Sequence, residues 1–449
     1  MTLAPLQSIF DLYCSGLSKD VVEGLASKHG FALNAQTYTP QLVIWLMIWQ
    51  SLEARGTSAE AVSSVRQGKW VRLRLRRRPG QRWGTRKPEE ISPRTGGYCR
   101  ARQGLPSGMF QDLTSHLTVE LQRQTSAPQP ERPVYLVDGS SLQAQAEPEL
   151  VKLYPPARNQ HGSAHWPVLR VVVLHDARTG LAMPPVWGPM NGPEAVSEQA
   201  LAEQLIESVP ADGVLLGDRN FGIFAIAYAA THRQRNVLLR LTEARAKAIA
   251  GGRLRDGTDR KVVWRPSRWD RKHHLQLPAE ASVSGRLIAC SAPGWRGLVY
   301  LFTTLEDPVG EILKLYRLRW NVELDLRSFK RTLNFYRLAS RSAAMIDKEV
   351  WAAIAAYNLV RTVMARAAEL ANLDPRRLSF TSVLYLVHAF LPDLLTCSPR
   401  KAEREMQRLI QLAAGCTLPN RSSPRSYPRA VWRPGYRYPS RRENAKTSK

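Results

Sequence analysis

The order of apolar and polar residues divides the chain into a helical first part, a strand-rich middle and a helical last part. Apolar residues recur at helical spacing in four early segments, 6–17, 21–29, 40–53 and 58–65. A further helix followed by a Pro-rich linker occupies 108–130, and apolar helices return after residue 340. The most apolar segment, PQLVIWLMIWQSL, is shorter than the roughly 20 residues that a membrane span needs. We therefore expect a buried helix there, and no signal peptide at the start.

The middle of the chain carries short apolar runs bounded by turn residues, which predict an α/β fold. The predicted strands are 134–138, 168–175, 182–188, 213–217 and 236–241, and the predicted helices are 194–208 and 221–233. Between 242 and 298 the β-like pieces are RKVVWRPSR, HLQLP and ASVSGRLIACS. A strand, VYLFTT, and one long helix over 311–333 follow.

Two aspartates end predicted strands. Asp138 follows the apolar run of PVYLVDGSS, and Asp218 follows that of VLLGDRNFG. Ligands of open α/β sheets bind at the carboxyl ends of strands, so both residues are candidates for a site. Asp-Gly and Asp-Arg-Asn are also common in turns, and that reading stays open for each aspartate taken alone.

The helix predicted over 311–333 places four polar residues on one face: Tyr316, Arg319, Glu323 and Lys330. At about 100° per residue they fall within an arc of roughly 60°. A carboxylate between cations suits a metal ion beside a phosphate group. The alternative is an ordinary ion pair between Arg319 and Glu323 on a solvated helix.

The charge of the chain indicates a polyanionic partner. There are 64 Lys and Arg residues against 38 Asp and Glu, a net charge of +26, in a chain that is 44% hydrophobic. Nucleic acid is the partner we expect, and an anionic membrane surface is the alternative. Residues 66–87 contain ten cations and no acid. We expect this stretch to contact the DNA backbone rather than to be a solvated linker, through Lys69, Arg72, Arg74, Arg76, Arg77 and Arg78.

The cysteines and the paired histidines give no sign of a metal site. Five cysteines are widely scattered without a C-x2-C pair, so neither a disulfide framework nor a zinc site is indicated. His273 and His274 are adjacent in a basic segment and do not share a helix face, so we expect them to be solvated.

The spacing Tyr316-x2-Arg319-x3-Glu323-x6-Lys330 matches the Y-x2-R-x3-E-x6-K signature of the fourth insertion-sequence family of bacterial DDE transposases. The segments DGS at Asp138 and GDRNFG at Asp218 resemble the blocks that hold this family's two aspartates. The resemblance covers residues 90–345.

This resemblance implies a ribonuclease H-like catalytic core with a β-rich insertion, plus helical amino-terminal (DNA-binding) and carboxyl-terminal regions. The expected regions are 1–125 (helical and basic), 133–241 (core), 242–298 (insertion), 299–345 (core with the Glu323 helix), 346–420 (helical) and 421–449 (basic tail). Asp138, Asp218 and Glu323 would hold two Mg²⁺ ions, for which Mn²⁺ is expected to substitute.

The resemblance also assigns roles to other residues. Tyr316, Arg319 and Lys330 would bind DNA phosphates, and Arg219 and Asn220 would support the site. Trp295 is the candidate for holding a flipped base, with Trp264 and Trp269 as competitors, because an exposed ring is a stacking platform.

The resemblance implies that the protein cleaves insertion-sequence ends and transfers them to a target. This would be cut-and-paste transposition through a hairpin intermediate. The partners would be double-stranded DNA (inverted-repeat ends and target), bound by a homodimer with no membrane, in the bacterial cytoplasm at the nucleoid. The alternatives are a structure-specific nuclease on the same core and a non-catalytic repressor derived from a transposase.

Overall fold

The computed structural model describes residues 17–31, 37–53, 56–70, 90–125, 132–160, 162–291, 297–332, 336–395 and 397–419. By its contacts the chain divides into two units, Met1–Thr417 and Leu418–Lys449, and the fold below is that of the first. Four predictions lie outside the described residues: the helix over 6–17 except Leu17, the basic residues from Arg72 to Lys87, Trp295, and the basic tail.

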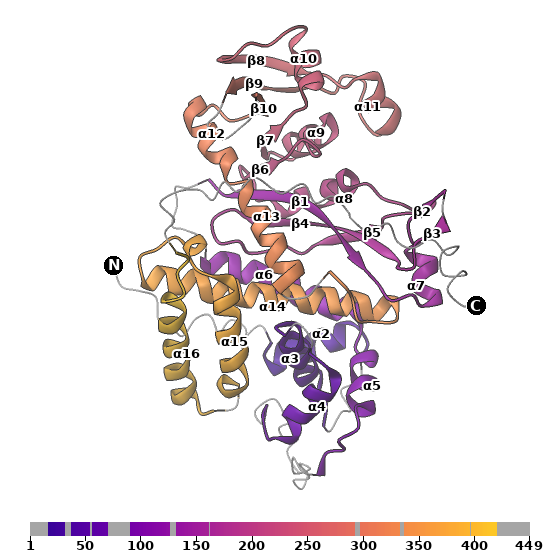
Figure 1. The fold of residues 1–449 in the computed structure, drawn as a ribbon, viewed down its shortest axis with the longest axis vertical. Helices are drawn as coiled ribbons and strands as arrows, with labels where there is room; N and C mark the ends of the chain where they lie inside the picture. The colour runs from indigo at the N-terminus through magenta and orange to yellow at the C-terminus, as the bar shows by residue number, and fades with distance from the viewer. Residues whose placement is uncertain are drawn as a thin grey trace, which may run out of the picture. The chain divides into compact units, whose positions relative to one another are not determined.

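The centre of the first unit is an eight-stranded sheet in the order β5-β4-β1-β6-β7-β10-β9-β8 (Figure 1). Its strands are β1 (Val134–Gln143), β4 (Val168–Asp176), β5 (Val186–Pro189), β6 (Val214–Gly217), β7 (Asn236–Arg240), β8 (Thr258–Trp264), β9 (Val283–Ser291) and β10 (Leu298–Thr303). A separate two-stranded sheet joins β2 (Arg158–Asn159) to β3 (Gly162–Ser163).

The first five strands establish the fold class. β4 is antiparallel to β1 and β5 is antiparallel to β4, whereas β6 is parallel to β1 and β7 is parallel to β6. Three antiparallel strands, with two more added parallel to the first, are the strand order of the ribonuclease H-like fold. The predicted fold class is therefore confirmed. Strands β10, β9 and β8 continue the same sheet beyond β7, all antiparallel.

Each face of the sheet is covered by helices, because apolar residues alternate along its strands. On one face, Tyr135 and Val137 share a core with α8 (Glu198–Leu205), α9 (Phe224–His232) and α10 (Glu243–Ala250). On the other face, Leu136 shares a core with α12 (Val309–Arg317) and α13 (Trp320–Arg327).

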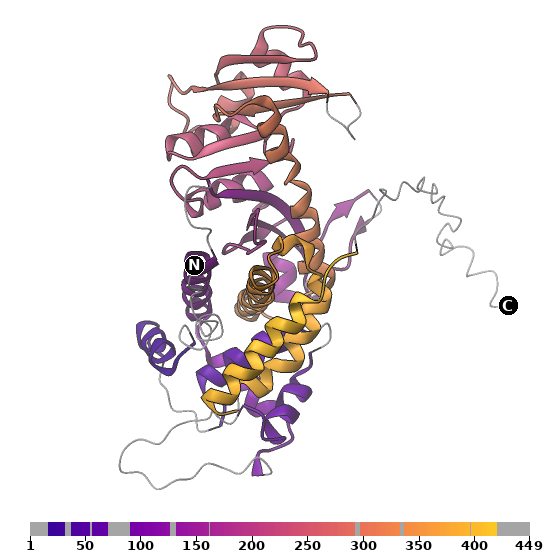
Figure 2. The ribbon, with the colours of Figure 1, turned by 90° about the vertical axis from the view of Figure 1, so that its left-hand side faces the viewer.

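A second group of helices packs around α14 (Ala343–Leu370), whose side chains are buried over most of its length. Its neighbours are α6 (Ser107–Thr125), α3 (Pro40–Ser51), α15 (Phe380–Leu394) and α16 (Pro399–Ala414). Figure 1 shows α14 below the sheet, and Figure 2 views it nearly along its axis. The other helices are α2 (Lys19–Lys28), α4 (Ser58–Arg66), α5 (Gly96–Gly104), α7 (Pro148–Leu153), α11 (Arg268–His273) and the short turns η3 (Ile206–Ser208), η4 (Ser328–Thr332) and η5 (Pro375–Arg377).

Two strand predictions were wrong in their bounds. β1 does not end at Asp138 but continues to Gln143, because β4 pairs with it along its whole second half. The Asp-Gly-Ser sequence is therefore strand and not turn, and only the pairing with β6 stops earlier, at Leu136. β5 begins at Val186 rather than 182, since the preceding two prolines have no N–H to donate to a ladder.

The single helix predicted over 311–333 was also wrong. The chain leaves α12 at Arg317 and enters α13 at Trp320, and between them Leu318 and Arg319 donate backbone hydrogen bonds to the carbonyls three residues back. Such bonds tighten the turn and interrupt the α-helical pattern. A π-helical turn, η4, then carries Lys330.

Between β7 and β10 the described residues contain two helices that were not predicted, α10 and α11, beside the strands β8 and β9. The piece HLQLP is a turn and not a strand.

Candidate active site

Asp138 lies in β1, just past the point where this strand stops pairing with β6. Its carboxylate accepts a hydrogen bond from the Gly139 N–H at 2.8 Å. Burial, together with the carboxylates of Asp218 and Glu198, raises the pKa of Asp138 to about 6, although the Gly139 N–H and the Arg319 charge act to lower it. The side chain is therefore a partly desolvated acid among like charges, an environment that disfavours its ionised form.

Asp218 directly follows β6, the strand beside β1. Its Oδ1 accepts a hydrogen bond from the backbone N–H of Asn220 at 2.8 Å. The prediction that this aspartate stands at the carboxyl end of a buried strand is confirmed. Because β1 and β6 are parallel neighbours whose pairing ends at Leu136 and Leu216, the two aspartates lie beside each other just past the last pair.

Glu323 and Arg319 form an ion pair at the start of α13, with 2.9 Å between Nη2 and Oε1. The arginine side chain is only 10% exposed and the glutamate 43%. The guanidinium also lies over the Trp320 ring, 4.7 Å from its centroid, and its charge acts on Asp138. Arg319 therefore connects Glu323 electrostatically to the first aspartate, which the solvated-helix alternative does not account for.

The other two residues of the predicted strip lie differently. Tyr316, at the end of α12, is buried, and burial raises the pKa of its phenol above the ordinary value while Arg319 and Arg240 lower it. Lys330 is half-buried in the π-helical turn. The structure thus brings Tyr316 and Arg319 beside the aspartates and places Lys330 in the π-helical turn that directly continues α13.

The remaining candidates divide into described and undescribed residues. Trp295 lies outside the described residues, but its flanks Ser291 and Leu298 pair with each other. Trp264 is 4% exposed in the core against Phe302, whereas Trp269 is 56% exposed. Lys69 follows α4 in a turn and is half-buried. The predicted solvent exposure of His273 is confirmed; His274 is partly buried.

Sequence reasoning missed Glu198, the first residue of α8. Its carboxylate lies against the backbone of Gly139, where a Cβ added to the glycine would come within 2.6 Å of Cδ. Its Oε2 accepts a hydrogen bond from the Asn220 side chain at 2.5 Å. Gln199 also donates to the Asn220 side chain, at 2.6 Å. In the sequence, Ser197-Glu198 shows only the usual start of a helix, with a capping serine and an acid in the first turn.

The carboxylates of Asp138, Asp218 and Glu323 are the kind of oxygen ligand that a hard cation prefers. In this structure they do not converge on a single position. Among the residues that the structure describes, no group of three or more His, Cys, Asp or Glu side chains is placed to hold an ion. Asp138 and Asp218 are close enough to repel each other, and Glu323 is turned toward Arg319. Oxygen ligands are those that Mg²⁺ prefers, and a cation would relieve the repulsion.

Comparison with known proteins agrees with this geometry. Residues 129–359, more than half of the chain, match the family model described as "Transposase DDE domain". The chain belongs to the DDE transposases. It is therefore a phosphoryl-transfer enzyme of DNA transposition, and this family works with divalent metal ions.

Two individual proteins are similar to this transposase. The "Transposase InsG for insertion sequence element IS4" of Escherichia coli (strain K12) is 30% identical over 315 residues, which are 68% of each chain, in agreement with the resemblance to the fourth insertion-sequence family. A chain in "Cryo-EM structure of piggyBac transposase synaptic complex with hairpin DNA (SNHP)" has 8% identity and a TM-score of 0.44 over 89% of this chain and 84% of that one. No helix in the described part of the transposase has the length and apolarity of a membrane span.

Proposed function

We propose that this transposase cuts insertion-sequence ends out of DNA and joins them to a target, with Asp138, Asp218 and Glu323 as its catalytic acids. The observation that supports the proposal is that the neighbouring strands β1 and β6 bring Asp138 and Asp218 together, and that α13 lies against β1. Two carboxylates act on each other there, and Arg319 links them to the third. An ion pair on a solvated helix would need no such arrangement.

Mg²⁺ is the metal we propose, with Mn²⁺ as a substitute, and the three acids would hold it. When bound, divalent ions there supply an activated oxygen nucleophile and neutralise charge on the leaving oxygen. The protein's own part is positioning. Arg319 and Lys330 bind phosphate oxygens of the reacting end, and a phosphate that draws the guanidinium of Arg319 leaves Glu323 available as a ligand. Tyr316 is buried and Arg319 acts on it electrostatically, so we propose that it supports Arg319 rather than binding phosphate itself as the resemblance implied.

Glu198 and Asn220 support the second aspartate. Asn220 donates its backbone N–H to Asp218 and its side-chain N–H to Glu198, so the glutamate holds the loop that orients Asp218. We propose both as positioning residues, since side chains behind the ligands orient them.

The partners follow from the activity. We propose inverted-repeat ends and target duplex as the DNA substrates, a homodimer that joins two ends, and a hairpin intermediate, with Trp295 holding the flipped base. Residues 1–125, including the cations from Lys69 to Arg78, would bind the ends. We place this activity in the bacterial cytoplasm, at the nucleoid.

The test uses a duplex that carries the inverted repeat flanking the coding region, with nicked, hairpin and joined products resolved on gels. Asp138→Ala, Asp218→Ala and Glu323→Ala should each abolish cleavage while leaving end binding nearly intact, because the basic surface supplies most of the affinity. Glu311→Ala, in an exposed ion pair on α12, is the matched control and should cleave normally. Cleavage without joining by the wild-type protein would favour a nuclease, and neither activity would favour a repressor.

A further inference from the structure

Helix α11 presents cations outward and turns its one acid inward. Arg265, just before the helix, and Arg268 and Lys272 within it are exposed. Asp270 is only 8% exposed, and its carboxylate accepts hydrogen bonds from the backbone N–H and the hydroxyl of Ser267 at 2.8 and 2.6 Å. The outer surface of this short helix is therefore positively charged without a compensating carboxylate of its own.

An aromatic ring lies among these cations in a fixed orientation. Trp269 is 56% exposed, and its ring stacks on that of His273 with 4.1 Å between centroids and 22° between planes. The His273 Nδ1 lies 2.8 Å from the Trp269 carbonyl oxygen, which holds the supporting ring in place. A large apolar side chain that stays half in water beside several cations is typical of nucleic-acid-binding surfaces.

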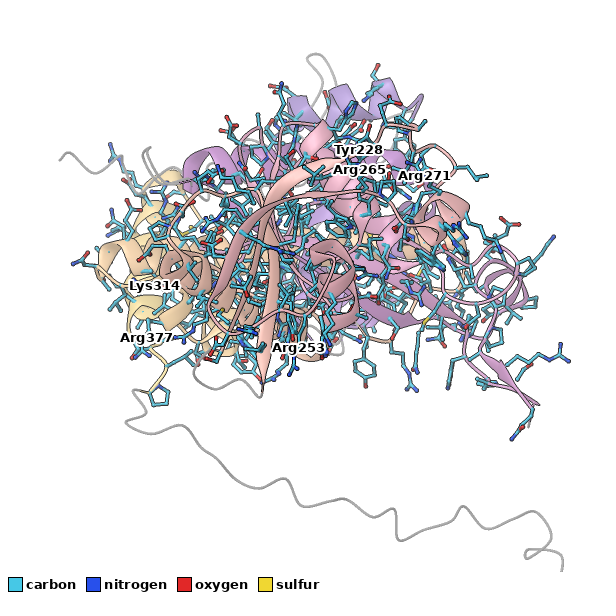
Figure 3. The ribbon with its side chains drawn as sticks, turned by 90° about the horizontal axis from the view of Figure 1, so that it is seen from above. Tyr228, Arg253, Arg265, Arg271, Lys314 and Arg377 are labelled. Atoms are coloured by element: carbon cyan, nitrogen blue, oxygen red, sulfur yellow. The ribbon has the colours of Figure 1, made fainter. Side chains whose placement is uncertain are left out.

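The inner side of α11 is connected to the loop after the second catalytic aspartate. Asp270 acts electrostatically on Arg245 of α10, and Arg245 donates a hydrogen bond to the Gly222 carbonyl at 2.6 Å. Gly222 in turn donates its N–H to the Asp218 carbonyl at 3.0 Å. Figure 3 labels Arg265 and Arg271 in this part of the molecule, with Tyr228 of α9.

We propose that α11 with Arg265 is a second DNA-contacting surface, which binds the backbone of the duplex beyond the reacting end. Arg265, Arg268 and Lys272 contact phosphates, and the Trp269 ring packs against a deoxyribose. Duplex DNA is the partner we propose because the chain belongs to enzymes of DNA transposition. An anionic membrane surface, which the exposed Val263 and Leu275 beside α11 would also suit, is an outcome that the test distinguishes. The inference rests on the proposed action on DNA.

The charge test compares two proteins that each lose three cations. One carries Arg265→Gln, Arg268→Gln and Lys272→Gln; Arg271 is kept because it donates to the Pro278 and Ala279 carbonyls. The control carries Arg400→Gln, Lys401→Gln and Arg404→Gln, three exposed cations on α16. Affinity for a duplex is measured between about 50 and 300 mM salt, with folding checked by thermal melting. Each lost phosphate contact lowers the salt slope by about 0.9, so we expect a decrease of up to about 2.7 in the first protein and little in the control.

The ring is tested separately. Trp269→Ala should weaken duplex binding roughly 5-fold or more with an unchanged salt slope, and Trp269→Phe should recover most of the loss, because only apolar contact is removed. Equal slopes in the two triple variants, or wild-type binding by Trp269→Ala, would overturn the proposal. The proposal would also be overturned if these variants lost affinity only for anionic vesicles or only for single-stranded DNA, and bound duplex DNA like the wild-type protein. These binding assays need neither metal nor cleavage, so they decide the role of α11 even if the wild-type protein proves unable to cut an end.

Discussion

Replacing Asp138 by asparagine should make the metal-free transposase more stable at neutral pH. Asparagine has the same shape and keeps an oxygen for the Gly139 N–H. It removes a charge that burial and two neighbouring carboxylates disfavour, the cause of a pKa of about 6. Against an ordinary pKa of about 3.9 in the unfolded chain, the difference corresponds to at most about 3 kcal/mol above pH 6, and less where water reaches the side chain.

The raised pKa of Asp138 also fixes how the stability difference between the wild-type protein and Asp138→Asn changes with pH. A carboxyl whose pKa is raised on folding stabilises the fold at low pH, and this contribution is lost as the pH rises through the folded-state value. The wild-type protein should therefore lose stability relative to Asp138→Asn between about pH 4 and pH 6. Urea unfolding in EDTA at pH 4 and pH 7.5 measures this gap, which should be near zero at the first and largest at the second.

Two comparisons make the test specific. Asp256→Asn is a matched control, since hydrogen bonds from Ser291 lower the pKa of Asp256 and its replacement should not stabilise. If Asp138 is a metal ligand, as we propose, added Mg²⁺ should stabilise the wild-type protein more than Asp138→Asn. A gap that is absent at pH 7.5, or that does not change with pH, would refute this account of Asp138.

Three further predictions concern the surroundings of the acids. Asp325→Ala should lower the free energy of unfolding by about 3–5 kcal/mol in urea titrations, because Arg361 and Arg376 lose the carboxylate that they share. The control Glu369→Gln breaks an ion pair whose carboxylate is exposed, and it should lower the free energy of unfolding by less than about 1 kcal/mol. Arg319→Lys should slow hairpin formation and joining by orders of magnitude with folding unchanged, since lysine lacks the planar fork; wild-type product yields would remove Arg319 from phosphate binding. Glu198→Ala should slow cleavage about 10- to 100-fold, and Glu198→Gln, which still accepts from Asn220, should restore most of kcat; equal rates in both variants would exclude the positioning role.

The positions of the core strands along the chain could be predicted because short apolar runs bounded by turn residues are a local signal. That these strands form a ribonuclease H-like sheet was implied only by the family resemblance. The break before α13 could not be predicted. At Leu318 and Arg319 the backbone N–H groups bond to the carbonyls three residues earlier, and this local change leaves the apolar spacing of the segment nearly unchanged. Helix α10 is a different case. Its capping residue Thr242 and the left-handed Gly251 (φ 68°) are start and stop signals that the sequence displays.

The part of the candidate site that depends on spacing within one segment of the sequence could be predicted. The motif places Arg319 four residues before Glu323, and the ion pair follows from that spacing. The contact of Glu198 with Gly139 joins a helix start to a strand some sixty residues earlier, and it arises only when α8 packs on β4, the strand beside β1. The register that carries β1 past Asp138 likewise depends on β4 as a partner.

The most direct test of the metal-binding acids is strand joining by Asp218→Cys in Mg²⁺ and in Mn²⁺. A thiolate is a softer ligand than a carboxylate and suits Mn²⁺ better than Mg²⁺. If Asp218 holds the catalytic metal, the variant should form almost no joined product with Mg²⁺ and recover joining with Mn²⁺, while the wild-type protein joins ends with both. Joining by the variant at the wild-type rate in Mg²⁺ would contradict the assignment of Asp218 as a metal ligand.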